Sequence, residues 1–267
     1  MIGPVAAYAK LAELRLRATY AYPLVVVGGL LTVLLQIFLL RSVWTAVYGG
    51  RASVEGVELS ALITFVTLAN LQLLAMRPIL VWYLEQRIHD GEIGVDLVRP
   101  VPFLGQLLAQ QVGATLANLP FVIVGIPFAM FLGQLALPAS PAAAAWYLVS
   151  FVLAYVIAML IGLLMGLVAF WTVQTLGVAV IYNFAAQFLG GALVPLYFFP
   201  DALRAVAELL PFQAQVFIPI SIYTGSISEI GAIARALGIQ LMWVGLLALL
   251  AGAVWHRARR VVTVYGG

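Results

Sequence analysis

No Asp, Glu, Lys, Arg or His occurs between Arg99 and Asp201, a stretch of 101 residues. The hydrocarbon core of a bilayer is about 30 Å thick, and a helix needs roughly 20 apolar residues to cross it. The stretch is therefore long enough for several crossings. The whole chain has 64% hydrophobic and 9% charged residues, whereas a typical soluble domain has about 25% charged residues. These features predict an all-α, polytopic membrane protein.

Charged residues and helix breakers divide the chain into individual spans. The long uncharged stretch is cut at Leu135–Ala144, which contains two prolines, and at the polar patch Trp171–Thr175. The result is a single transmembrane domain, residues 1–267, with six predicted spans at 18–40, 59–82, 103–132, 145–170, 176–198 and 236–255.

The basic residues near the span ends predict the orientation. With six spans both termini share one side of the membrane, and nine Lys and Arg residues fall on that side against four on the other. Basic residues favour the cytoplasmic side. We therefore expect a multi-pass protein of the cell membrane with both termini in the cytoplasm.

Two segments are apolar or amphipathic but do not read as simple spans. Pro211, Pro219 and Gly225 interrupt the uncharged stretch 209–228, so residues 201–228 are expected to form short helices at the outer membrane surface or dipping partway into the membrane. A kinked seventh span is the alternative, because prolines do occur within spans. Near the N-terminus, Lys10 and Glu13 lie on one helical face, which is typical of an interfacial helix. A solvated leader is the alternative there.

Several kinds of chemistry lack the residues they need. The only lysine is Lys10, so the chain has no P-loop, and there is no H-E-x-x-H motif. There is no Cys and there are two His, which argues against a metal site. No ionisable residue lies in the middle of a span, where an ion-coupled transporter usually carries one. We expect a non-enzymatic protein without a cofactor of its own, and any energy input would come from another polypeptide.

Uncharged polar residues recur at helical spacing within two spans. Gln111, Thr115 and Asn118 follow an i, i+4, i+7 pattern, and Asn183 and Gln187 follow i, i+4. Such stripes avoid lipid. Hydrogen bonding between helices and contact with a translocated substrate are the two interpretations. A G-x-x-x-G pair, Gly162 and Gly166, is consistent with close helix packing, within the chain or between two chains.

The segment 83–102 is the longest charged connection on the predicted cytoplasmic side. It holds six charged residues, and Gly91, Gly94 and Pro100 divide it into turns. Its apolar surface comes from Ile88, Ile93, Val95, Leu97 and Val98. A solvated loop and a docking element for a cytoplasmic partner are both consistent with this pattern.

Three stretches carry a resemblance to a known family. They are GEIGVDLVRPVP at Gly91–Pro102, GGALVPLYFFPDALRAVAELLPF at Gly190–Phe212 and PISIYTG at Pro219–Gly225. They resemble the permeases of type 2 ABC exporters, in particular a six-span subfamily related to daunorubicin-type and viologen-type drug exporters.

The resemblance implies a role for the cytoplasmic segment. In such permeases a coupling helix between the second and third spans docks on an ATPase, which here corresponds to about residues 85–99. Polar contacts would come from Glu85, Glu92, Asp96 and Arg99, and Ile93 and Leu97 would fill an apolar groove.

The resemblance also implies partners and cargo. Two permeases, identical or homologous, would enclose a path for an amphipathic or lipid-like substrate or drug, and a pair of cytoplasmic P-loop ATPases would supply ATP and Mg²⁺ chemistry. Lipid would surround the spans, and no nucleic acid is involved. The alternatives from the residues are a non-transporting scaffold, a secondary transporter with backbone ion sites, and uptake in place of export.

Overall fold

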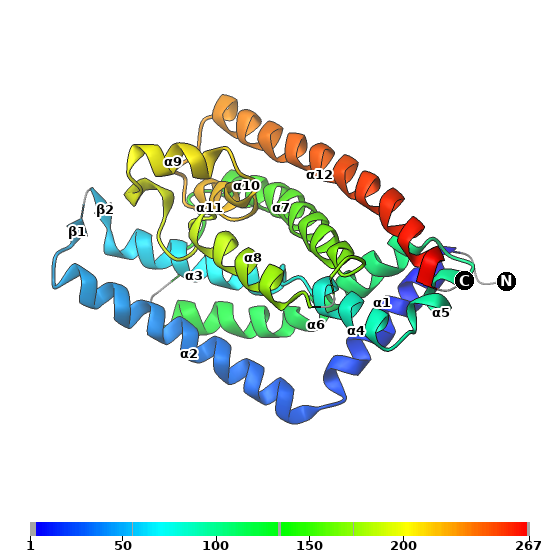
Figure 1. Ribbon diagram of the computed structural model, residues 1–267. Helices are drawn as coiled ribbons and strands as arrows, with labels where there is room; N and C mark the ends of the chain where they lie inside the picture. The colour runs from blue at the N-terminus through cyan, green and yellow to red at the C-terminus, as the bar shows by residue number, and fades with distance from the viewer. Residues whose placement is uncertain (1–3, 55, 133–134, 173, 266–267) are drawn as a thin grey trace.

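The computed structural model describes residues 4–54, 56–132, 135–172 and 174–265. Its elements in chain order are α1 (Pro4–Tyr20), α2 (Pro23–Tyr48), β1 (Ser53–Val54), β2 (Val57–Glu58), α3 (Leu59–Ala75), α4 (Leu80–His89), α5 (Ile93–Val98), α6 (Phe103–Phe131), α7 (Pro141–Val168), α8 (Leu176–Phe188), η1 (Leu196–Phe198), α9 (Asp201–Glu208), α10 (Pro211–Gln215), α11 (Phe217–Tyr223) and α12 (Ile230–Tyr265) (Figure 1). The fold is that of an all-α polytopic membrane protein, as predicted. The strands β1 and β2, of two residues each, pair as an antiparallel hairpin.

Five segments of the described chain are long and apolar enough to cross a membrane. They are Pro23–Tyr48, Leu59–His89, Phe103–Phe131, Pro141–Val168 and Ile230–Val261, and α8 is a shorter apolar helix. The sequence predicts a crossing over 176–198, but α8 stops after 13 residues. Gly191 follows with a positive φ of 82°, and Pro195 precedes the 3₁₀ turn. Glycine adopts such a φ without steric cost, so the chain turns there.

The long uncharged stretch breaks close to the two expected positions. α6 ends at Phe131 and α7 starts at Pro141, where the Ser140 side chain accepts a hydrogen bond from the Ala143 amide at 3.0 Å. Serine before a proline at the first helical position is a typical helix start. α7 ends at Val168 and α8 begins at Leu176, with residue 173 of the polar patch outside the described residues.

α10 and α11 are short helices that pack against α7 within the bundle. Most of their side chains are buried. The carbonyl of Gln215 accepts a hydrogen bond from Gln72 at 2.7 Å, and that of Ala214 accepts one from Gln240 at 2.8 Å. Broken helices are tolerated at membrane depth only where protein shields their backbone, and these glutamines of α3 and α12 provide that shield.

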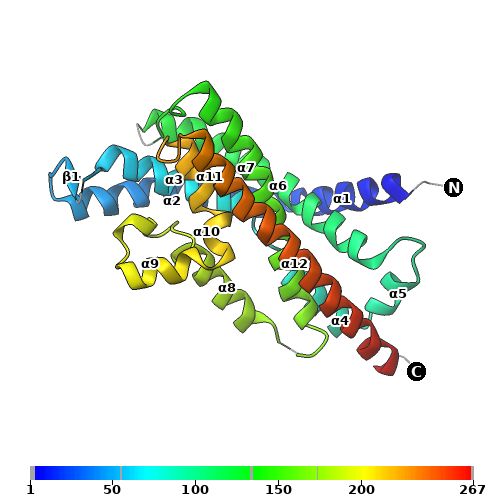
Figure 2. The same ribbon diagram turned by 90° about the horizontal axis from the view of Figure 1, so that it is seen from above.

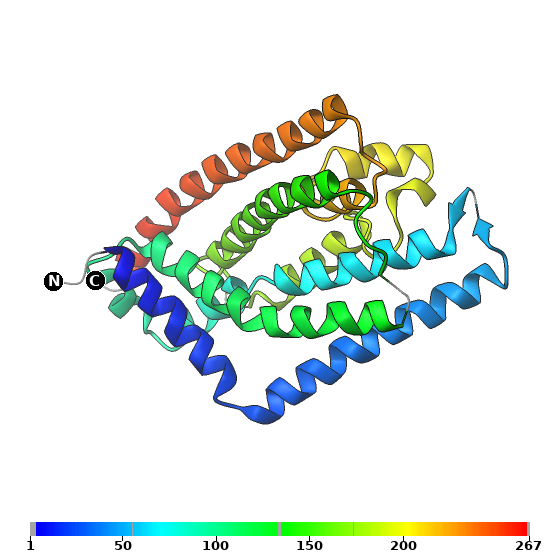
Figure 3. The ribbon, with the colours of Figure 1, turned by 180° about the vertical axis from the view of Figure 1, so that it is seen from behind.

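α7 is the central helix of the bundle. It packs against α4, α6, α10, α11 and α12, and Figure 2 shows α12 lying across it. The start of α1, the end of α12 and α5 gather at one end of the molecule, whereas the hairpin and α9 lie at the other (Figures 1 and 3). α1 runs beside α6, where Ala12 is buried and approaches Gly113 so closely that a Cβ there would clash.

Candidate functional site

A cluster of ionic side chains holds α5 against α4. The Arg87 guanidinium donates two hydrogen bonds of 2.7 Å to the Asp96 carboxylate, and Arg99 lies 3.0 Å from the same carboxylate. Arg87 also pairs with Glu92. Asp96 is only 2% exposed. A buried carboxylate that binds two arginines has little capacity left for a partner, so its role is to brace α5.

α5 has an inward and an outward face. Ile93 and Leu97 pack against the apolar cluster around Leu84, although the resemblance assigns them to a groove on the ATPase. Val95 and Val98 point outward and are 58% and 82% exposed. The sequence identifies both valines as apolar residues of this segment but does not separate them from Ile93 and Leu97, although their i, i+3 spacing marks a distinct face.

The braced α4–α5 unit also contacts the start of α8. The Thr175 hydroxyl donates a hydrogen bond to the Glu85 carboxylate, and Thr175 is fully buried. Gln106 of α6 donates to the Asp96 carbonyl at 2.8 Å. Glu85 is thus directed toward the base of α8 and not toward the exposed face of α5.

The polar stripe of α6 bonds to neighbouring helices. Gln111 accepts from the Ile79 amide and donates to the Arg77 carbonyl, each at 3.0 Å, and so satisfies the backbone where α3 and α4 separate. Thr115 accepts from the Tyr155 hydroxyl at 3.1 Å, and Asn118 donates to the Leu74 carbonyl at 3.3 Å. These contacts fit the interhelical interpretation of the stripe.

The polar pair of α8 lines a cavity between α2, α3, α8 and α10. The cavity has a volume of about 290 Å³. Its polar lining consists of Gln36, Asn70, Arg77, Tyr182, Asn183, Gln187 and Gln215. The two stripes predicted from the sequence therefore separate, because only the α8 pair reaches this cavity. Gln36 donates a hydrogen bond to Asn70 across it at 2.8 Å.

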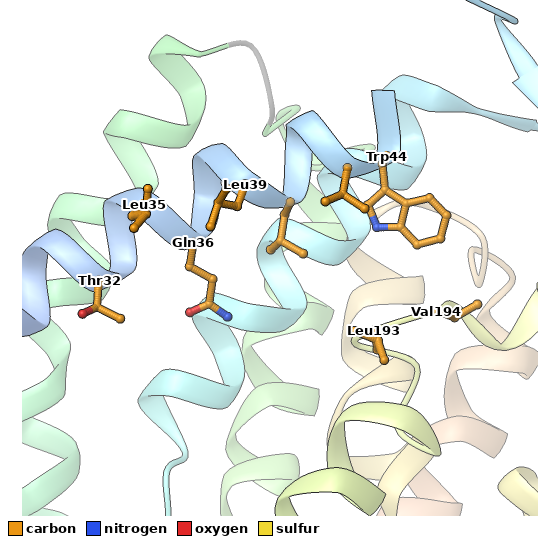
Figure 4. Close-up of a pocket in the computed structure, with 9 residues that line it drawn as sticks. Thr32, Leu35, Gln36, Leu39, Trp44, Leu193 and Val194 are labelled. Carbon is orange, nitrogen blue, oxygen red and sulfur yellow. The ribbon is translucent and has the colours of Figure 1, made fainter. Parts of the chain in front are cut away.

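A second, apolar pocket adjoins the polar cavity. It has a volume of about 580 Å³ and runs along α2, with Leu193 and Val194 of the segment after α8 on its far side (Figure 4). Gln36 lines both spaces, and Figure 4 shows its amide directed away from α2 toward α3. We call the two spaces together the α2–α8 cleft.

Among the described residues, no group of three or more His, Cys, Asp or Glu side chains could hold a metal ion.

A family model describing ABC-2 family transporter proteins matches residues 30–266. No curated protein and no solved structure gives a significant match. The match covers all the apolar helices after the start of α2, including the braced α5 and the α2–α8 cleft. The chain therefore belongs to the ABC-2 transporter family and is a membrane-spanning permease component of an ABC transporter.

Proposed function

We propose that this permease exports an amphipathic or lipid-like substrate, and that cytoplasmic P-loop ATPases drive it by docking on the outward face of α5. The observation that carries the proposal is the architecture of α5. It is a short helix held rigidly by buried ion pairs, yet it presents Val95 and Val98 to solvent. Exposed apolar residues on a rigid support are typical of an interaction site.

The expected orientation places α5 where an ATPase could reach it. α5 lies at the same end of the bundle as the start of α1 and the end of α12 (Figure 1). The excess of basic residues on the side of the termini favours the cytoplasm for this end. Glu92, which is exposed beside the two valines, supplies a charged contact at the edge of the docking surface.

The contacts of α4 suggest how ATPase motion reaches the transport path. Asp96 and Arg87 tie α5 to α4, and Glu85 ties α4 to the base of α8 through Thr175. α8 in turn carries Asn183 and Gln187 into the cleft. Rigid-body movement of α5 on ATP binding would therefore shift α8 and change the shape of the cleft.

A second permease would cover the α2–α8 cleft. Gln36, Asn70 and Gln187 line a cavity at the depth of the apolar helices, and polar groups at that depth avoid lipid. A homologous or identical subunit placed against α2 and α8 would shield them and complete the path. The uncharged spans favour an amphipathic cargo, because many unpaired ionic groups would be costly to bury. The relation to drug exporters rests on the sequence resemblance.

Site-directed cross-linking tests the docking proposal. The chain has no cysteine, so Val95→Cys introduces a unique thiol on α5. A thiol-to-amine cross-linker applied to inverted membrane vesicles should join this position to a P-loop ATPase, identified by mass spectrometry. The matched control is Glu58→Cys, which is exposed at the opposite end of the molecule.

Two results would contradict the proposal. One is the absence of any nucleotide-binding protein from the Val95→Cys adducts, which would favour the scaffold or secondary-transporter alternatives. The other is equal labelling from both positions, which would mean that the cross-links report random collision.

A further inference from the structure

We propose that the α2–α8 cleft selects an amphiphile with a single anionic head group that also carries a hydroxyl or amide donor. The inference rests on the proposed function, because it names the class of substrate for the same path. Phosphate, sulfate and carboxylate heads share this chemistry, whether they belong to a membrane lipid or to an amphiphile from the cytoplasm.

Arg77 supplies the charge that selects an anion. Of the described residues that line the polar cavity, Arg77 alone is charged. Its side chain is exposed, and within the described chain it forms no ion pair. Its guanidinium lies 6.0 Å from the centre of the Trp82 ring, which leaves its donors available. Guanidinium groups bind planar or tetrahedral oxyanions through paired hydrogen bonds.

Gln215 supplies an acceptor for a neutral donor on the same head group. It is fully buried and lines the cavity, yet its side-chain oxygen has no hydrogen-bond partner among the described residues. Its amide nitrogen is already engaged, because it donates to the Tyr182 hydroxyl at 2.8 Å. A buried acceptor without a partner is costly, so a hydroxyl or N–H on the ligand would satisfy it.

The adjoining pocket accommodates the apolar part of the same molecule. Leu35, Leu39, Val43 and Trp44 line it (Figure 4), and Gln36 borders both spaces. The polar and apolar volumes are therefore continuous, which matches one molecule with a polar head and an apolar body.

The position of Arg77 suggests where the head group enters. α3 begins beside the β1–β2 hairpin and has 17 residues, which is about 25 Å at 1.5 Å per helical residue. Arg77 follows two residues after its end. In the orientation proposed above, that depth is near the cytoplasmic boundary of the membrane. The anionic head would enter there, while the apolar body lies along α2.

Quenching of Trp44 fluorescence measures binding in the cleft. The full-length chain, with any subunits that co-purify, is kept in micelles of an uncharged maltoside detergent. Three probes carry the same brominated acyl chains: phosphatidate as the anion, diacylglycerol as the neutral lipid, and a trimethylammonium lipid as the cation. The signal from the cleft is the quenching lost in Trp44→Phe. Phosphatidate should bind about tenfold more tightly than diacylglycerol, the size expected for one charge-assisted hydrogen bond.

Variants at Arg77 separate a specific contact from general surface charge. Arg77→Gln should remove the tenfold preference and Arg77→Lys should keep most of it. Arg257→Gln, which removes an exposed charge of α12 at the same end of the protein, should leave it unchanged. Gln215→Glu, which replaces the free acceptor with a second negative charge, should weaken phosphatidate binding relative to diacylglycerol.

Three outcomes would overturn the inference: equal binding of the three probes, stronger binding of the cationic lipid, or equal effects of Arg77→Gln and Arg257→Gln. Displacement of phosphatidate by inorganic phosphate at the same concentration would refute the role of the apolar pocket. These readouts do not require an ATPase. The inference can thus fail while an ATPase partner is found, and it can hold while none is found.

Discussion

Replacing Asp96 with Asn tests whether the buried ion cluster braces α5. The substitution keeps the shape of the side chain but removes the charge that faces Arg87 and Arg99. Breaking a buried ion pair by removing one partner costs roughly 3–5 kcal/mol. We expect about 3 kcal/mol, the lower end of that range, because Arg87 keeps its contact with Glu92 and Arg99 is partly exposed. Since 1.4 kcal/mol is a factor of ten, opening of α5 should become about a hundredfold more frequent.

Hydrogen exchange followed by mass spectrometry measures this opening directly. Protection of the amides in 91–98 should fall in Asp96→Asn, while that of α7 stays unchanged. The matched control is Glu92→Gln, because Glu92 is 53% exposed and an exposed pair contributes only about 0–1 kcal/mol. Equal protection of α5 in Asp96→Asn and the wild type would refute the bracing role, as would an equal effect of the two substitutions.

Three further substitutions test the packing. Gly166→Ala places a Cβ 2.9 Å from the Leu80 carbonyl, so the free energy of unfolding, measured by thermal denaturation, should fall by about 1–3 kcal/mol. The control Gly238→Ala meets no atom within 4 Å and should not lower it. Equal stability of the two variants would contradict the close contact of α7 and α4. Gln240→Leu leaves the Ala214 carbonyl without its donor, which should lower the free energy of unfolding by about 1–3 kcal/mol. The control Gln174→Leu changes an exposed residue and should leave stability unchanged. Unchanged stability of Gln240→Leu would mean that α10 does not depend on α12. Thr175→Val removes the hydrogen bond to Glu85, so transport should fall while ATPase binding persists. The control is Thr172→Val in the same connection between α7 and α8. Unchanged transport in Thr175→Val would refute the coupling of α4 to α8 through this hydrogen bond.

The all-α polytopic fold and the two breaks in the uncharged stretch were accessible from the sequence because they depend on charge and on helix breakers. The uncharged stretch required several crossings, and the prolines before α7 marked its start. The end of α8 at Phe188 was missed because the residues after Gly191 remain apolar. Apolarity indicates that a segment avoids water, but it does not distinguish a helix that faces lipid from a turn buried in protein.

The candidate site was predictable only in part. Charge and turn residues located the α5 segment, and helical spacing identified the stripes of α6 and α8. Which stripe lines a cavity depends on the break between α3 and α4, since Gln111 is held there by backbone groups. Similarly, Asp96 turns inward only because Arg87 lies nine residues earlier on another helix. Such pairings arise from tertiary structure, so the spacing of residues along the chain does not predict them.

As the permease of an ATP-driven transporter, this chain requires a separate ATPase. The most direct test is affinity purification of the tagged protein from its native membrane in mild detergent, with quantitative mass spectrometry of the proteins that co-elute. We predict a P-loop ATPase in equimolar amount to the permeases, and its loss when Val95 and Val98 are both changed to Asp while the protein still inserts in the membrane. Recovery of the chain under several gentle conditions without a nucleotide-binding protein would contradict an ATP-driven permease.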